Sequence, residues 1–153
     1  GFFSVFRFGV AIPTTNFRAF VGFKNSATIL SNANPSTQTS IIGFGWDSAQ
    51  TTLRAISANS TVANTVDLGA NFPTNVGNSN WYECYIYAMP NAGNVYYRVV
   101  RLNTGDVVTG QFNSTNLPTG ATFLTFQLWH NNGSDAVSAG LDFGGLYIDN
   151  LST

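Results

Sequence analysis

Carboxylates are the first candidates for chemistry in this chain, because glycoside hydrolysis usually requires a pair of them about 5–10 Å apart. The chain has one Glu, Glu83, and its other acidic residues are Asp47, Asp67, Asp106, Asp135, Asp142 and Asp149. No two of these carboxylates occupy alternate positions of one strand, so the sequence offers no obvious pair on one face. We expect Glu83 instead to form a cross-strand ion pair, with Arg98 as the candidate partner.

The other residues that could do chemistry are few. His130 is the single His and Cys84 the single Cys, and no G-x-S-x-G motif accompanies them. A Ser-His-Asp triad or a usual zinc site is therefore not predicted, and Cys84 is expected to be a small core residue. Asp135 with Asn131 and Asn132 could supply oxygens to a loop calcium, which is the alternative to having no cofactor. The chain is accordingly predicted not to be an enzyme.

The composition narrows the possible partners. Only 8% of the 153 residues are charged and the formal net charge is −1, whereas a typical soluble domain has roughly 25% charged residues. A nearly neutral chain has little attraction for polyanions, so nucleic acid is not an expected ligand. No run of 18 apolar residues occurs, and membrane insertion is not expected. Ser, Thr and Asn replace the missing charges, which suits burial in an assembly or contact with neutral hydrogen-bonding surfaces such as sugars.

The elements that must position these residues are short strands. No window shows a helical period, and alternating or short apolar runs are separated by Gly, Asn, Pro, Ser and Thr. The expected strands are 2–12, 17–24, 40–47, 52–57, 63–68, 81–88, 95–102, 106–112, 121–130 and 141–150. Strands at this spacing predict a single all-β domain over 1–153, a two-sheet antiparallel sandwich.

The alternation of side chains assigns faces to the strands. In 81–88, the set Tyr82, Cys84, Ile86 and Ala88 is predicted to point inward, with Trp81, Glu83, Tyr85 and Tyr87 on the other face. Phe20 is likewise expected on an outer face. Either such aromatic faces are covered by loops, a neighbouring domain or another subunit, or some of their rings form a stacking platform for sugars.

Four stretches together resemble a known family. They are FRAFVGFK at 17–24, SIIGFGWDSAQTTLR at 40–54, the long hairpin 81–100 and LDFGGLYIDN at 141–150. This pattern is similar to concanavalin A-like jelly rolls and to surface domains of bacteriophage virions, such as tail fibre or tailspike tips, receptor-binding modules and capsid decorations. The resemblance implies a concanavalin A-like jelly roll on a virion surface, assembled in the host cytoplasm without disulfides, and commonly trimeric. Catalytic members carry an E-x-D-x-E type strand that is absent here.

The sequence therefore predicts a virion domain, part of a longer protein, that binds a host-surface carbohydrate or receptor. The alternative is a structural capsid, collar or decoration domain that acts through oligomeric packing. Expected partners are the host glycan or receptor, other virion proteins and further copies of the chain, with a trimer favoured. The first candidate ligand contacts are Trp129, His130, Asn131, Asn132 and Asp135, followed by Trp46 with Asp47 and by Trp81 with Tyr85 and Tyr87.

Overall fold

The computed structural model describes residues 1–25, 32–78 and 80–151. It contains ten strands and two short 3-10 helices, η1 (Pro35–Thr37) and η2 (Ser114–Asn116). The strands are β1 (Phe2–Ile12), β2 (Arg18–Lys24), β3 (Ile41–Trp46), β4 (Arg54–Ala58), β5 (Ala63–Asp67), β6 (Asn80–Ala88), β7 (Tyr96–Arg101), β8 (Val107–Gln111), β9 (Thr125–Asn131) and β10 (Gly140–Asn150). Each predicted strand has an observed counterpart, and the bounds differ by a few residues at most.

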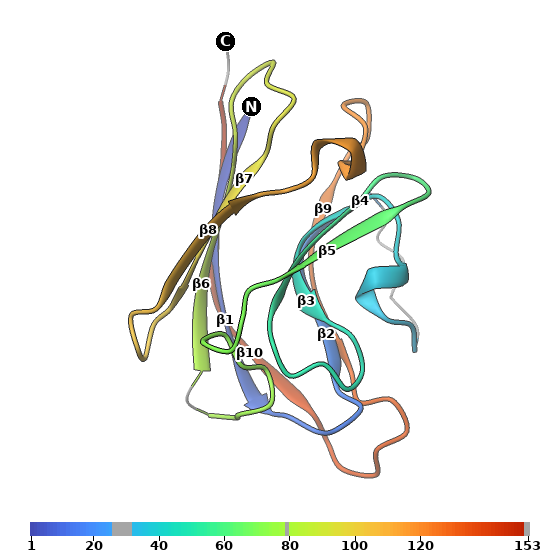
Figure 1. The fold of residues 1–153 in the computed structure, drawn as a ribbon, viewed down its shortest axis with the longest axis vertical. Coiled ribbons are helices and arrows are strands. Elements are labelled where there is room, and N and C mark those ends of the chain that lie inside the picture. Colours follow the sequence, from blue (N-terminus) through green and yellow to red (C-terminus); the bar gives the residue numbers. More distant parts are fainter. Residues whose placement is uncertain (26–31, 79, 152–153) are drawn as a thin grey trace.

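The strands form two five-stranded antiparallel sheets that face each other (Figure 1). Sheet A has the order β10-β1-β6-β7-β8, and sheet B has the order β5-β4-β3-β2-β9. The chain changes sheet after β1, β5, β8 and β9, while β2 to β5 and β6 to β8 follow as hairpins. This confirms the predicted all-β, two-sheet antiparallel sandwich.

The core lies between the sheets and is rich in aromatic rings. Phe6 of sheet A contacts Phe44 of sheet B with 6.0 Å between ring centroids, and Phe44 makes an edge contact with Tyr97 at 5.8 Å. Tyr82, Cys84, Ile86 and Ala88 all point into this core, as the alternation predicts. Cys84 is fully buried, so its thiol acts as a small apolar side chain.

The outer face of sheet B is covered. Phe20 points outward from β2 yet is 0% exposed, and it packs in a second cluster with Ile41, Ile56 and Ala58. The helix η1 lies against β2, β3 and β5 on this side. Of the two interpretations of such faces, coverage applies to Phe20, because its ring is buried within the chain itself.

Glycines make room for the Phe20 ring. Gly22 and Gly43 are directly paired across β2 and β3, and a methyl group placed on either would lie 3.0 Å from Cζ of Phe20. The ring thus lies over two residues that lack side chains, which explains the glycines within these strand sequences.

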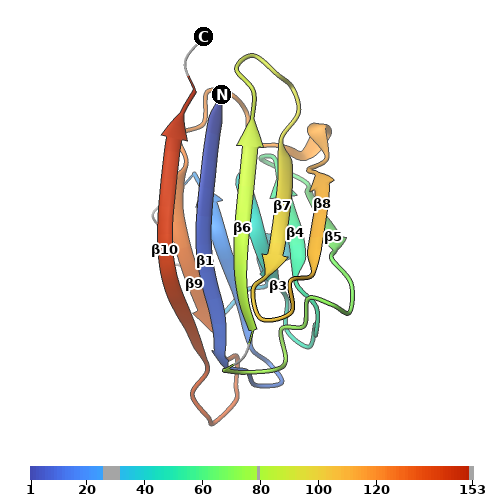
Figure 2. The same cartoon turned by 90° about the vertical axis from the view of Figure 1, so that its left-hand side faces the viewer.

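The outer face of sheet A is open. Figure 2 shows β10, β1, β6, β7 and β8 in front, and none of the other described strands or helices crosses them. Any ligand that approaches this side of the molecule meets the outward side chains of these five strands.

Candidate functional site: the aromatic face of sheet A

Trp81 lies flat on the open face of sheet A. Its neighbour across the β6–β1 pairing is Gly9, and a methyl group placed on Gly9 would lie 2.9 Å from Cε2 of the indole. A methyl group on Gly144 of β10 would lie 3.0 Å from Cζ3 of the same ring. The indole therefore rests on two glycines of adjacent strands, and it is half-buried on the outer face of sheet A.

A polar network occupies the middle of the same face. Arg7 of β1 donates from Nε to Oε2 of Glu83 at 2.5 Å and also forms a salt bridge with it, while the Tyr85 hydroxyl donates to Oε1. The Glu83 side chain is 11% exposed and that of Arg7 is 54% exposed. The hydrogen bond from Tyr85, together with Arg7, lowers the pKa of Glu83, and the same bond raises the pKa of Tyr85.

The ion-pair partner of Glu83 differs from the one predicted. Glu83 pairs with Arg7 because the β1–β6 register places these two residues opposite each other. Arg98 stands opposite Tyr85 instead, with its guanidinium carbon 5.2 Å from the centroid of the Tyr85 ring. The hairpin between β6 and β7 was predicted, but its register is offset by two residues from the one that an Arg98–Glu83 pair requires.

A shallow hollow lies farther along the face. It has a volume of 240 Å³, and its lining residues are Phe3, Tyr85, Tyr87, Tyr96, Tyr97 and Arg98. Tyr87 and Tyr96 are directly paired across β6 and β7, and Phe3 is paired with Tyr87 across β1 and β6. All six lining residues lie on strands and have aromatic or cationic side chains, and they surround a depression that can accept part of a ring-shaped ligand.

These features follow one line along β6. Trp81, Glu83, Tyr85 and Tyr87 alternate on the outer side of the strand, and the six steps from the first residue to the last span about 20 Å. The aromatic face, defined here as Trp81, Tyr85, Tyr87, Phe3 and Tyr96 with the Arg7–Glu83 pair and Arg98, is therefore longer than one sugar ring. It combines flat apolar surfaces with fixed hydrogen-bonding groups.

The first set of sequence-predicted ligand contacts, on β9 and in the turn after it, does not form one surface. Trp129 is paired with Phe20 and packs against the covered outer cluster of sheet B, whereas His130 is paired with Ala19 and contacts the core ring of Phe17. Consecutive strand residues point to opposite faces, so Trp129 and His130 do not share one ligand surface.

The remaining members of that set hold a turn together. The amide of Asn132 donates to the backbone oxygens of Asp135 and Val137, and Oδ1 of Asn131 accepts from the Gly133 N–H. The carboxylate of Asp135 accepts from the backbone N–H of Asn16 at 2.9 Å and from its amide at 2.6 Å. These bonds, with one from Thr14, lower the pKa of Asp135.

Trp46 and Asp47 also have structural contacts. The Trp46 indole is 1% exposed and donates to the backbone oxygen of Phe17 at 3.0 Å, so it has no surface on which a ligand ring could stack. Asp47 accepts from the backbone N–H and the hydroxyl of Ser36, at 3.0 and 2.5 Å. Of the sequence-predicted residues, the structure places only Trp81, Tyr85 and Tyr87 together on an open face.

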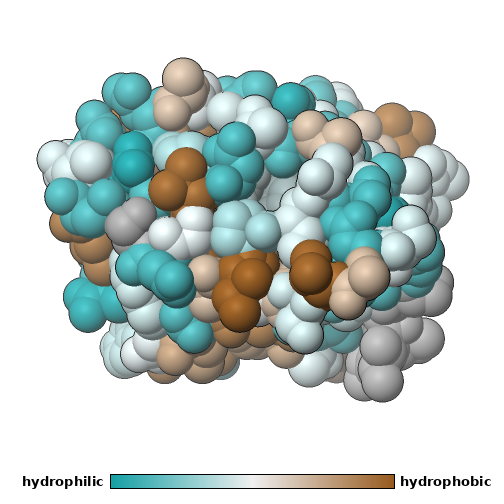
Figure 3. All heavy atoms as spheres, turned by 90° about the horizontal axis from the view of Figure 1, so that it is seen from below, coloured by the Kyte–Doolittle hydropathy of each residue, from teal (hydrophilic) through white to brown (hydrophobic). Residues whose placement is uncertain are grey.

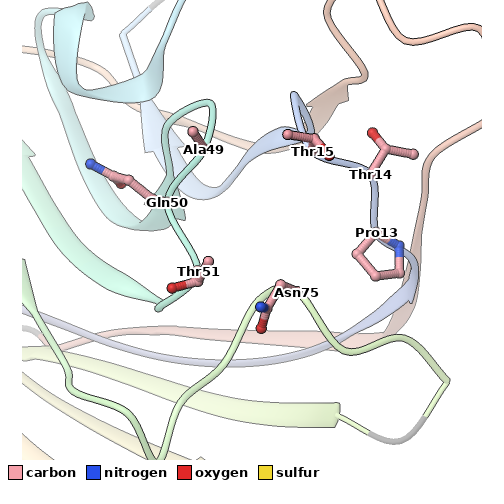
Figure 4. A pocket seen from close by; sticks show the side chains of 7 residues that line it. All are labelled: Pro13, Thr14, Thr15, Ala49, Gln50, Thr51 and Asn75. Atoms are coloured by element: carbon pink, nitrogen blue, oxygen red, sulfur yellow. The ribbon is translucent and has the colours of Figure 1, made fainter.

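A second depression lies at the lower end of the sandwich. Its volume is 360 Å³, and it is lined by Pro13, Thr14, Thr15, Ala49, Gln50, Thr51 and Asn75. In Figure 4 the Gln50 amide points away from the other lining side chains, and its oxygen accepts from the Asp47 N–H. Figure 3 shows this end as mainly hydrophilic, with hydrophobic residues in small separate groups. None of the lining residues is aromatic or charged, so this depression lacks the stacking surface that sheet A has.

Sequence reasoning missed Phe3, Arg7, Tyr96 and Arg98 as parts of the site. Phe2 and Phe3 are adjacent aromatics, so alternation alone does not say which one points outward. Arg98 and Tyr96 alternate in β7, and that period-two signal was available. The pairing of β7 with β6 and of β1 with β6 is what brings these residues beside Trp81 and Tyr85.

Comparison with known proteins assigns no family to the chain. No family model matches the chain, and no curated protein matches it. A solved structure of SCP-B, a member of the eqolisin family of peptidases, in a complex with the tripeptide Ala-Ile-His, is similar at 16% identity and a TM-score of 0.42. The similarity covers 95% of this chain and 68% of that one.

This finding corrects one prediction. The prediction that the chain is not an enzyme is contradicted, because the similar protein is a peptidase, and we withdraw it. A likeness at this TM-score assigns neither an activity nor a site to the chain. Within the described ranges, no group of three or more His, Cys, Asp or Glu side chains could hold a metal ion, and no helix is long and apolar enough to span a membrane.

Proposed function

We propose that the chain is a carbohydrate-binding domain that holds an oligosaccharide on the aromatic face of sheet A. The observation that supports this most directly is the position of Trp81, whose indole rests on Gly9 and Gly144 on the outer face of sheet A. A rigid, flat indole matches the CH-rich face of a sugar ring, and it loses little conformational freedom when it binds.

The polar groups beside Trp81 suit the hydroxyls of a sugar. Arg7 is half-exposed and already fixed by Glu83, so its remaining N–H groups are oriented without further loss of entropy. Arg98 is exposed and rests on the Tyr85 ring. The hollow near Tyr87 and Tyr96 lies about 20 Å from Trp81 along β6. We therefore propose a ligand of several sugar units that lies along this strand.

The glycan is proposed to belong to a host cell surface, and the domain to a virus particle. These two parts rest on the sequence resemblance, and they are separate from the geometric argument for sugar binding.

Titration of glycans tests the proposal. Host-surface oligosaccharides would be screened on an array, and the best binder titrated by calorimetry against the unchanged chain, Trp81→Ala and Trp129→Ala. Loss of one stacking ring on the site is expected to weaken binding by about tenfold or more, equivalent to about 1.4 kcal/mol. Trp129→Ala is the matched control on sheet B and is expected to bind as the unchanged chain does.

Two outcomes would contradict the proposal. One is that no oligosaccharide on the array binds at millimolar concentration. The other is that Trp129→Ala weakens binding while Trp81→Ala does not, which would move the site to the end of β9 that the sequence first indicated. Thermal melting of both variants separates a loss of contact from a loss of folding.

A further inference from the structure

The edge of the sandwich formed by β10 leaves core-facing apolar side chains at the surface. Phe143 and Leu146 are paired with Phe8 and Phe6 of β1, which are 0% and 1% exposed. Phe143 and Leu146 themselves are 50% and 40% exposed, and Ile148, on the same inner side, is 44% exposed. The inner face of sheet A is thus closed at β1 but not at its edge strand.

This edge has less of the usual protection against pairing than the other edges have in their shortness. β10 has 11 residues, whereas the other edge strands, β8, β5 and β9, have 5, 5 and 7. Native edge strands are commonly protected by shortness, by charged side chains, by Pro or by bulges, and of these β10 has two Asp residues and a bulge. Gly140–Asn150 contains no Lys, Arg or Pro. A long apolar edge of this kind is a template for another strand.

The pattern of backbone hydrogen bonds shows which residues present free groups. Gly1 and Leu151 exchange both backbone bonds, at 3.1 and 3.0 Å. Antiparallel pairs alternate between bonded and non-bonded, so every second residue of β10 from Leu151 toward Gly145 points its N–H and C=O at β1. Leu146 and Ile148 therefore point theirs at the free edge.

The bulge in β10 reverses this alternation. The register with β1 shifts between Arg7, paired with Gly145, and Phe8, paired with Phe143, so Gly144 is the extra residue. Beyond it, the odd-numbered residues Leu141 and Phe143 face inward. In the other half of the strand, the even-numbered Leu146 and Ile148 face inward.

We propose that β10 pairs with β10 of a second copy of the chain, antiparallel about a two-fold axis between Gly144 and Gly145. In this register Phe143 lies opposite Leu146 of the second copy, and Leu141 lies opposite Ile148. Both pairs are inward-facing, apolar and made of residues that point their backbone groups at the free edge. On both sides of the axis, β10 presents inward-facing apolar side chains and free backbone groups at equivalent distances. Such a strand suits an isologous interface, in which both copies use the same surface.

Charge supports the same register. The proposed register places Asp142 opposite Tyr147 of the second copy on the outer face, and no two acidic residues lie opposite each other. A shift that placed Asp142 opposite Asp149 would set two like charges directly against each other, which destabilises a sheet. The charges of β10 therefore select the arrangement that the apolar residues also favour.

The resulting dimer would have one continuous ten-stranded sheet. Both copies of the aromatic face would then lie on the same side of that sheet, with Trp81 of each copy near the axis because its ring covers Gly144. This arrangement differs from the trimer that the sequence resemblance implies.

Sedimentation from micromolar to near-millimolar concentration tests the dimer. The unchanged chain is expected to approach twice its mass of 16.4 kDa, and the double variant Leu146→Lys with Ile148→Lys is expected to remain monomeric. Val107→Lys is the control, because Val107 is 50% exposed on β8, the opposite edge of the same sheet. A monomer throughout, a trimer, or a dimer that persists in the double variant would overturn the proposal.

Cross-linking tests the register. In the proposed pairing, positions 142 and 147 form a non-bonded pair with Cα atoms about 4.5 Å apart, which a disulfide can span. Asp142→Cys with Tyr147→Cys is expected to oxidise to a covalent dimer. Asp142→Cys with Asp149→Cys is the control, two residues out of register, and it is expected to stay uncross-linked. Preferential cross-linking of the control would contradict the register.

Discussion

The two glycines beneath Trp81 determine what this residue can do. An indole on a flat, side-chain-free surface has one face fixed and the other available, whereas an indole between larger neighbours would be tilted or buried. Gly9 and Gly144 lie on different strands, so the platform depends on the pairing of β1 with β10 as well as on Trp81 itself.

Gly9→Ala is expected to lift the Trp81 ring from the sheet. The added methyl group would lie 2.9 Å from Cε2 of the indole, closer than a carbon contact allows. We expect weaker glycan binding, altered tryptophan fluorescence and a modest loss of stability of about 1 kcal/mol.

The control for that variant is Gly120→Ala, because a methyl group on Gly120 meets no atom within 4 Å. Unchanged glycan affinity in Gly9→Ala, measured by calorimetry, would show that the flat position of the indole does not matter for binding.

Glu83→Gln is expected to lower stability at neutral pH and to flatten its decline in acid. The pKa of Glu83 is lowered in the folded chain, while an unfolded Glu titrates near about 4.3. Its contribution is therefore complete above that pH and is lost as the pH falls through the lower folded value. Removing the charged acceptor for Arg7 and Tyr85 should cost about 1–2 kcal/mol at pH 7.

Urea unfolding from pH 7 to pH 2.5 measures this effect. Asp67 and Asp135 also have lowered pKa values, so the unchanged chain should lose stability over the same acidic range, and the variant should lose less. Asp149→Asn, at an exposed position of β10, is the control. Parallel stability curves for the unchanged chain and Glu83→Gln would contradict the role of the network.

At the scale of elements, the two outer faces of the sandwich differ in how far their aromatic side chains are buried. Both carry outward aromatic residues, yet Phe20 is fully buried in the outer cluster of sheet B, while Trp81 is only half-buried. Glycines lie beneath both rings, so the residues packed around each ring distinguish the buried cluster from the candidate binding surface.

Gly43→Ala is expected to destabilise sheet B strongly. The added methyl group would lie 2.5 Å from the backbone oxygen of Val21 and 2.7 Å from Cα of Gly22, so backbone would have to move. A cost of about 2–3 kcal/mol is expected, read as a lower midpoint in thermal or urea unfolding.

Gly93→Ala is the matched control, because a methyl group on Gly93 meets nothing within 4 Å. If Gly43→Ala unfolded at the same midpoint as the control, the close approach of β2 and β3 would be unimportant to stability.

At the scale of the whole molecule, Cys84 reports on the integrity of the sandwich. Its thiol is completely buried between the sheets, and burial raises its pKa well above the usual range. We expect it to resist thiol reagents in native buffer and to react at a rate that follows global unfolding.

Labelling with a chromophoric disulfide reagent at increasing urea concentration measures this rate. The same reaction in full denaturant is the control for complete exposure. Rapid stoichiometric labelling of the native chain would contradict a closed core around β6.

The sequence by itself determined the strands, their inward faces and the antiparallel sandwich. These depend on local alternation and turn chemistry, and Tyr82, Cys84 and Ile86 were placed correctly from period two alone. The sequence also singled out Trp81, Tyr85 and Tyr87 as outward-facing, although it ranked Trp129 and His130 above them.

Only the tertiary structure decided which outward aromatics are accessible and which residues join them. Register between strands far apart in the sequence made Arg7 the partner of Glu83 and placed Gly9 beneath Trp81. The pairing of β2 with its neighbours buried Phe20 in an outer cluster, and the bulge at Gly144 set the faces of β10. Long-range pairing, loop path and bulges depend on the packing of the whole chain, because no local residue pattern encodes them.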